Sequence, residues 1–188
     1  MKKTLLLSVI ASTLMMAGGD IAPVEPMVET PDVQAEAPSR NFAPAIALIG
    51  GAMDIDNSNS DWKGFYGAEL SFNCLLSDAI RQQIQITNYD NDGIQMLQAN
   101  INPHYMFDIA EGTKAGVGPT LGVAKVEVGN DDDTIFTYGV GASIRTDLTE
   151  NIFAGAEAKY EWTTDATIAG VDTDFDNAKV FAKLGYQF

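Results

Sequence analysis

The sequence WKGFYGAELSFNC, residues 62–74, alternates between two kinds of side chain. Its first, mostly apolar set is Trp62, Gly64, Tyr66, Ala68, Leu70, Phe72 and Cys74. Its second set, which contains the charged and polar side chains, is Lys63, Phe65, Gly67, Glu69, Ser71 and Asn73. Side chains of a β-strand point to opposite faces in turn. A period of two therefore predicts a strand whose two faces meet different environments.

The same alternation recurs from Ala45 to the end of the sequence, each time followed by turn residues. The alternating runs are 45–55, 62–74, 79–88, 95–107, 113–124, 134–146, 151–162 and 177–188. The long polar connections are 54–61, 125–133 and 163–176, the short ones are 75–78, 108–112 and 147–150, and the connection 88–94 is of medium length. Eight runs joined in this way are typical of an up-and-down meander. We therefore predict an all-β protein with an eight-stranded antiparallel up-and-down β-barrel over residues 45–188.

Alternation alone does not say which face of the barrel lies inside, because soluble lipocalin-like barrels and membrane barrels bury opposite faces. The polar face carries eight of the 17 glycines, which leaves room for charged side chains in a narrow lumen. Seven basic residues share that face: Lys63, Arg81, Lys114, Arg145, Lys159, Lys179 and Lys183. Both observations favour a transmembrane barrel. A soluble periplasmic lipocalin-like carrier remains a second alternative.

Aromatic residues of the apolar face gather near the ends of the runs. Trp62, Phe136, Tyr160 and Trp162 fall beside the long connections, and Phe72, Tyr105 and Phe107 fall beside the short ones. Two aromatic belts separated by aliphatic residues match the two interfaces of a membrane. We expect these side chains to be interface aromatics.

The N-terminal residues resemble a secretory signal peptide, which we place at 1–19. Lys2 and Lys3 precede an apolar segment too short to span a membrane, and Ala17-Gly18-Gly19 offers small residues for cleavage. Residues 20–44 hold five of the seven prolines among scattered acidic residues. This composition predicts a flexible Pro- and acid-rich tail.

The composition argues against several classes of function. The formal net charge is −15 and the pI about 4.1, so nucleic acid is not an expected partner. A single cysteine excludes a Cys-based zinc site, and the single histidine, His104, excludes sites that need two. Barrel enzymes that act on lipid A need a serine beside their histidine, and the residue two after His104 is Met106. We expect no enzyme activity, no cofactor and no metal site, and we expect solvated acidic loops, with a divalent bridge to lipopolysaccharide as the alternative.

Six charged residues of the polar face would lie in the lumen. They are Glu69, Arg145, Glu157, Lys159, Glu161 and Lys183. An eight-stranded barrel is barely wide enough for its own side chains, and buried charges must pair. We therefore predict a structural charge network that plugs the lumen, with a narrow low-conductance pore as the alternative.

The eight runs, the small-residue lumen and the final Lys183-Leu184-Gly185-Tyr186-Gln187-Phe188 resemble the small outer-membrane β-barrels of Gram-negative bacteria. These are the opacity-protein, OmpX and OmpA-transmembrane-domain type. The resemblance implies that Leu184, Tyr186 and Phe188 form the signal read by the barrel-assembly machinery. It also implies an outer-membrane protein in contact with outer-membrane lipids and lipopolysaccharide, with a structural or surface-interaction role. We expect it to be a monomer.

Overall fold

The computed structural model describes residues 42–56, 62–91 and 93–188. The expected signal peptide at 1–19 and residues 20–41 of the expected tail lie outside the described residues. The first strand begins at Ala45, where the alternation predicts the barrel to begin. No helix in the three described ranges has the length and hydropathy of a membrane-spanning helix.

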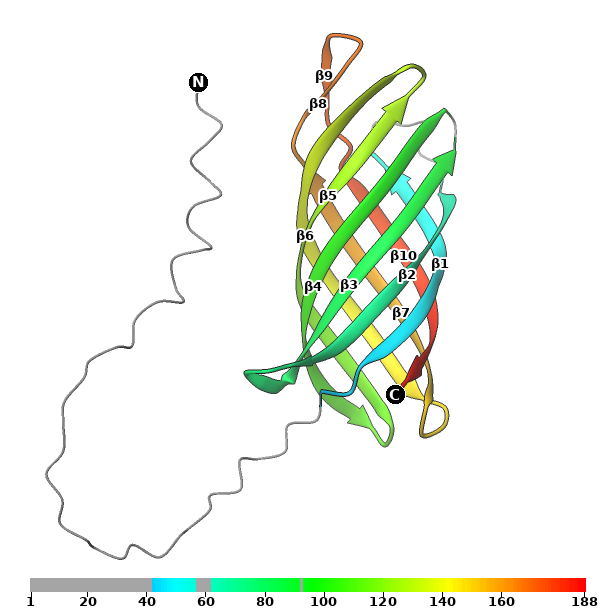
Figure 1. Ribbon diagram of the computed structural model, residues 1–188, viewed down its shortest axis with the longest axis vertical. Coiled ribbons are helices and arrows are strands. Elements are labelled where there is room, and N and C mark those ends of the chain that lie inside the picture. Colours follow the sequence, from blue (N-terminus) through cyan, green and yellow to red (C-terminus); the bar gives the residue numbers. More distant parts are fainter. Residues whose placement is uncertain (1–41, 57–61, 92) are drawn as a thin grey trace, which may run out of the picture. The chain divides into compact units, whose positions relative to one another are not determined.

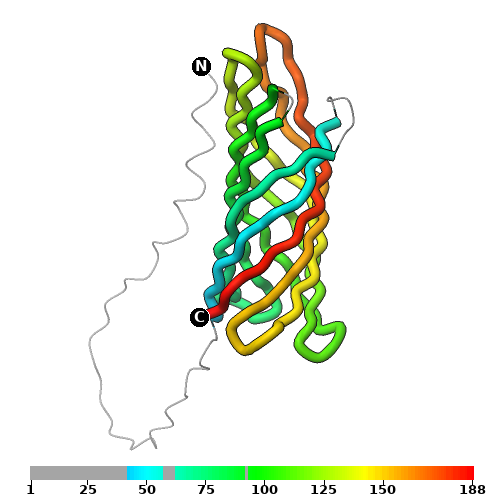
Figure 2. The backbone as a smooth tube through the Cα atoms, turned by 90° about the vertical axis from the view of Figure 1, so that its right-hand side faces the viewer, coloured from blue at the N-terminus to red at the C-terminus, as the bar shows by residue number. Residues whose placement is uncertain are grey.

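Eight long strands form one closed antiparallel barrel (Figures 1 and 2). They are β1 (Ala45–Ile55), β2 (Lys63–Cys74), β3 (Ser77–Asn91), β4 (Ile94–Ala110), β5 (Thr113–Val128), β6 (Asp131–Asp147), β7 (Ile152–Thr163) and β10 (Asn177–Gln187). Neighbours along the chain pair with each other, and β1 pairs with β10 to close the barrel. The predicted fold class is confirmed.

The two ends of the barrel differ in how the strands are connected. At one end, called the turn end below, short turns join β2 to β3, β4 to β5 and β6 to β7, and β10 ends there (Figure 1). At the opposite end, the loop end, β5 and β6 stay paired up to Val128 opposite Asp131. The acidic connection expected at 125–133 is therefore mostly hairpin, and its turn uses Gly129 with a φ of +66°. The prediction of a long loop here was wrong because Asp131–Asp133 place polar side chains on both faces of β6 and hide its alternation.

The connection from β7 to β10 contains a small hairpin that the sequence did not reveal. It consists of β8 (Ala166–Ile168) and β9 (Val171–Thr173). Strands of three residues are too short to show a period of two. Ala166, the first residue of β8, and Phe175, which follows β9, are buried in the apolar cluster at the loop end, so this connection covers part of the barrel interior.

The apolar alternate residues point away from the barrel and the polar ones point into it. Leu48, Val117 and Leu121 are 74%, 50% and 60% exposed, whereas Gln85 and Asn100 are 0% and 2% exposed. An apolar outer wall around a polar interior is the arrangement of a membrane barrel. A lipocalin-like carrier would have the reverse arrangement, so that alternative is not favoured.

Glycines on the inner face allow neighbouring strands to pack closely. A Cβ at Gly118 would lie 2.0 Å from the Pro103 carbonyl oxygen and 2.9 Å from His104 Cδ2. A Cβ at Gly139 would lie 2.0 Å from the Tyr160 carbonyl oxygen. Any larger residue at these positions has to push the neighbouring strand away.

The interior changes from apolar to charged along the barrel axis. At the loop end, buried apolar side chains form one cluster, which includes Met53, Ile55, Phe65, Met96, Val126, Ile135 and Phe181. The cluster also extends beside the charged residues, because Phe181 lies between Lys179 and Lys183 on β10 and its ring centroid is 5.5 Å from Lys159 Nζ. A lumen filled with polar and charged side chains throughout, as predicted, is therefore only part of what the structure shows.

Candidate functional site

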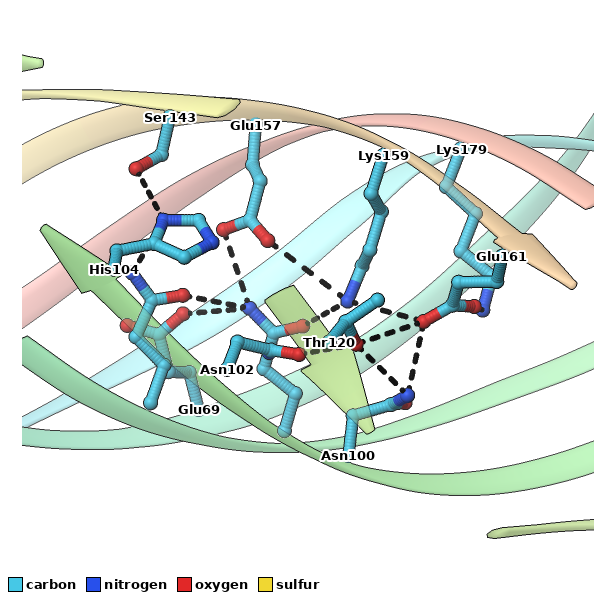
Figure 3. Close-up of polar contacts among 12 residues, drawn as sticks. Glu69, Asn100, Asn102, His104, Thr120, Ser143, Glu157, Lys159, Glu161 and Lys179 are labelled. Carbon is cyan, nitrogen blue, oxygen red and sulfur yellow. Dashed lines mark hydrogen bonds and ion pairs between the residues drawn. The ribbon is translucent and has the colours of Figure 1, made fainter. Parts of the chain in front are cut away.

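The middle of the interior holds ion pairs contributed by strands from around the barrel (Figure 3). Nearer the turn end, Lys183 on β10 donates from Nζ to Glu69 Oε2 on β2 at 2.7 Å and to Glu157 Oε2 on β7 at 2.8 Å. Gln85 on β3 donates from Nε2 to the same two oxygens at 2.9 and 3.3 Å. One ammonium and one amide therefore hold two carboxylates together; we call these four residues the Lys183 group.

A second group lies nearer the loop end, centred on Glu161 of β7. Its Oε2 accepts hydrogen bonds from Lys179 Nζ at 2.5 Å and from Gln98 Nε2 at 3.0 Å. Its Oε1 accepts from Asn100 Nδ2 at 2.9 Å and from Thr120 Oγ1 at 3.2 Å. Lys179 also donates to Gln98 Oε1. These five residues, the Lys179 group, satisfy both oxygens of a carboxylate that is completely buried.

Lys159 connects the two groups. Its Nζ donates to Gln85 Oε1 at 2.6 Å, and it lies 3.6 Å from Glu161 Oε1 and 3.8 Å from Glu157 Oε1 (Figure 3). The polar interior is consequently one continuous network rather than two separate ion pairs.

The charges of this network balance. It contains three carboxylates and three ammonium groups, and each of these side chains is at most 4% exposed. Moving ions from water into a protein interior costs several kcal/mol per ion unless close pairing and hydrogen bonds offset that cost. Loss of any single member therefore leaves an uncompensated buried charge.

Of the six lumen residues expected from the sequence, the structure brings together Glu69, Glu157, Lys159, Glu161 and Lys183. It does not bring Arg145 into their network. Arg145 lies at the turn end, where its guanidinium stacks 3.7 Å over the Phe153 ring and donates from Nε to Asp147 Oδ1 at 3.1 Å. Its position near the end of β6, next to a turn, places it beyond the reach of the central carboxylates.

Sequence reasoning left Lys179 and the interior amides out of the charge network. Lys179 shares its face of β10 with Lys183, four residues away, so the alternation was the signal that pointed to it. The amide side chains of Gln85 on β3 and of Gln98 and Asn100 on β4 lie on the inner face of their strands, as the alternation indicates. They were not among the predicted lumen residues because they carry no formal charge, although they take part in most of the hydrogen bonds of the network.

His104 is completely buried and its Nδ1 lies 2.8 Å from Ser143 Oγ. The sequence has no serine two residues after His104, and this serine comes from β6, which is distant along the chain. Gln83 Nε2 lies 3.4 Å from the same ring nitrogen. Both side chains of the Ser–His pair are enclosed in the interior, whereas a hydrolase needs its serine open to substrate.

The aromatics expected at the interfaces lie near the two ends of the outer wall. At the loop end, Trp162 packs against Tyr138 and Tyr160 with ring centroids 5.9 and 5.1 Å apart, and Trp62 and Phe136 are exposed. At the turn end, Tyr105 and Phe107 are exposed, and Phe72 stacks on Phe42 at 4.8 Å.

The C-terminal residues expected to form the assembly signal share the outer face. Leu184, Tyr186 and Phe188 are 59%, 45% and 67% exposed, and the Tyr186 and Phe188 rings are 5.3 Å apart. The backbone amide of Phe188 donates to the Pro44 carbonyl oxygen at 2.9 Å, which continues the pairing of β1 with β10 to the last residue.

Beyond the aromatic residues of the loop end, the β5–β6 hairpin carries exposed charges. The Glu127 carboxylate accepts a hydrogen bond from Lys125 Nζ at 2.6 Å and raises the pKa of Lys125, with Asp132 adding to the effect. In the part of the chain that the structure describes, no three acidic, histidine or cysteine side chains are grouped to hold a metal ion.

No protein-family model and no curated protein matches this sequence. Solved structures do share its architecture. Neisserial surface protein A superposes with a TM-score of 0.62 at 15% identity, over 77% of this chain and 97% of that one. The N-terminal β-barrel domain of Pseudomonas aeruginosa OprF gives 0.57 at 14% identity, over 79% and 100%. This chain has the fold of the small eight-stranded outer-membrane β-barrels.

The outer membrane protein H of P. aeruginosa, OprH, agrees, with a TM-score of 0.55 at 19% identity over 78% of this chain and 99% of that one. The resemblance inferred from the alternating runs is thereby confirmed at the level of the fold. Because each of these proteins is matched along nearly its whole length, the likeness covers the complete barrel and not one sheet of it.

Proposed function

We propose that this chain is an outer-membrane β-barrel protein of a Gram-negative bacterium, with a structural or surface-interaction role and a plugged lumen. The observation that carries the proposal is the inside-out distribution of side chains, with aliphatic residues exposed on the outer wall and ion pairs enclosed within. In water such a wall would be a large apolar patch, and in a bilayer it is the favourable surface.

The plugged lumen is supported by how the interior is filled. The ion-paired network occupies the middle of the barrel, and the apolar cluster with Phe175 and Ala166 lies between it and the loop end. An ion crossing the barrel would have to separate the network and pass the apolar side chains. A narrow pore is the competing function, and conductance distinguishes the two.

The proposed partners follow from the surfaces. The outer wall contacts outer-membrane lipids and lipopolysaccharide, and the exposed acidic hairpin and connections at the loop end form the surface available to other molecules. Leu184, Tyr186 and Phe188 engage the barrel-assembly machinery during biogenesis. The protein acts as a monomer and without a catalytic role. The name of neisserial surface protein A supports a surface role for this fold.

Two measurements test the proposal. Fractionation of cells should recover the protein with the outer membrane, in a form whose gel mobility changes on boiling, and recovery in the soluble periplasm would contradict the membrane assignment. Purified protein in planar bilayers should give no large, stable current steps when compared with protein-free detergent. Stable current steps would contradict the plugged lumen and support the narrow pore.

A further inference from the structure

At the turn end, next to the charged network, the barrel interior contains a cavity of about 160 Å³. Its charged lining residues are Asp78, Arg81, Lys114, Arg145 and Asp147. Basic side chains therefore outnumber acidic ones around this space, in a protein whose formal net charge is −15.

Arg81 is a buried cation whose hydrogen-bond acceptors are all neutral. It is 7% exposed, and it donates from Nε and Nη2 to Ser71 Oγ at 3.3 and 3.0 Å. Nη1 donates to Asn73 Oδ1 at 3.1 Å, and Nη2 also donates to the Ala43 carbonyl oxygen at 3.4 Å. Within the described ranges Arg81 forms no ion pair with a carboxylate, although burying a charge is unfavourable unless an opposite charge accompanies it.

Arg145 is the second guanidinium of the cavity wall, and it has spare donors. Its Nε is paired with Asp147 Oδ1 at 3.1 Å, and its Nη2 donates to Gln187 Oε1 at 2.6 Å. Its Nη1 is buried and has no acceptor among the residues that the structure describes. A buried donor without an acceptor is unfavourable, and an oxyanion is the acceptor that a guanidinium binds best.

The carboxylates that act on Arg81 from a distance, Glu69 and Asp147, are paired with Lys183 and Arg145 respectively. Lys114 is half-exposed and lies 3.6 Å from Asp108, Asp147 is the partner of Arg145, and Asp78 is exposed. One buried positive charge is thus left over beside a space large enough for a small ligand.

We propose that this cavity binds an oxyanion, namely a phosphate group, held between the guanidinium groups of Arg81 and Arg145. Arginine is suited to this because its planar fork offers paired N–H groups to phosphate oxygens. Free inorganic phosphate and the phosphate of a lipid headgroup present the same chemistry, and the cavity opens at the barrel end where a lipid interface is proposed.

The test uses the full barrel folded in zwitterionic micelles and titrated by calorimetry, in one series with inorganic phosphate and in another with short-chain phosphatidylglycerol. Saturation by phosphate identifies a free anion as sufficient, and saturation by phosphatidylglycerol alone identifies the headgroup. Arg81→Gln and Arg145→Gln should each lower the affinity for the saturating ligand at least tenfold. Lys125→Gln removes the same charge at the opposite end and should change the affinity less than twofold.

Absence of saturation in both series overturns the proposal, and so does an equal loss of affinity in Lys125→Gln, which would mean that overall charge attracts the anion. Heat-modifiable gel mobility establishes that each variant is folded. If the arginine variants do not fold, the thermal stability of the wild-type protein provides the test of phosphate binding. Binding to the folded state should raise the thermal midpoint in phosphate above that in chloride of equal ionic strength, and equal midpoints would reject the site.

Discussion

Replacing Glu161 with glutamine should lower the free energy of unfolding of the barrel by about 3–5 kcal/mol, because it leaves a buried lysine without its carboxylate. Glu161 lies 2.5 Å from Lys179 and 3.6 Å from Lys159, and both lysine side chains are 1% exposed. Glutamine has nearly the same shape and keeps one oxygen, which can accept the hydrogen bond that Gln98 donates to Oε2 or the one that Asn100 donates to Oε1, but not both. The loss therefore reports the missing charge and its hydrogen bonds, and not packing.

The measurement is urea unfolding of protein folded into lipid vesicles, followed by the fluorescence of Trp62 and Trp162, the two tryptophans of the chain. Glu127→Gln is the matched control, because it breaks the exposed 2.6 Å pair with Lys125. Exposed pairs contribute about 0–1 kcal/mol, so this variant should unfold close to the wild type. Adding Lys179→Met to Glu161→Gln should recover part of the loss, since the stranded charge is then removed as well.

The reasoning fails if Glu161→Gln unfolds like Glu127→Gln and the double variant shows no coupling between positions 161 and 179. That result would mean that water reaches the network and solvates the ions. The interior would then be a hydrated passage, and the pore would become the better description of the protein.

Further predictions test the outer wall, the inner glycines and the C-terminus. Ala156→Arg puts a charge on the exposed face of β7 and should cost about 2–4 kcal/mol in a bilayer if that position lies near the midplane; a neutral effect on vesicle unfolding would reject the lipid-facing assignment. Gly139→Ala should cost about 1–3 kcal/mol by overpacking, whereas Gly50→Ala, with no atom within 4 Å of its Cβ, should be tolerated in the same assay. Deletion of Phe188 should reduce the folded yield in cells far more than refolding into detergent, and equal losses would mean that Phe188 matters for packing alone.

The sequence was sufficient to predict the strands because successive side chains of each strand face lipid and the barrel interior in turn. This imposes a strict period of two. It was insufficient at the loop end, where Asp131–Asp133 put polar side chains on both faces of β6 and the period is lost on that strand. The acidic segment at 131–133 consequently looked like a loop, although it is paired with β5.

The interior was predictable by face but not by depth. Parity placed Arg145 and Glu161 on the same inner surface, yet only their heights along the barrel decide that Glu161 meets Lys179 and Arg145 does not. Those heights depend on strand register, which the alternation leaves open. The proximity of Ser143 to His104 depends on register in the same way, because the two residues come from strands that are not paired with each other.

The pairing of β1 with β10 joins the first and last strands of the barrel, so the wall cannot close until β10 has docked. That same strand carries Lys179 and Lys183, which are two of the three lysines facing the interior carboxylates. Before it docks, Glu69, Glu157 and Glu161 have Lys159 as the remaining ammonium of the network. Closing the wall and neutralising the interior are therefore a single event in assembly. A barrel whose final strand is missing or out of register would keep an open edge and an excess of negative charge together, two defects that discourage it from persisting in a membrane as a stable, half-built intermediate.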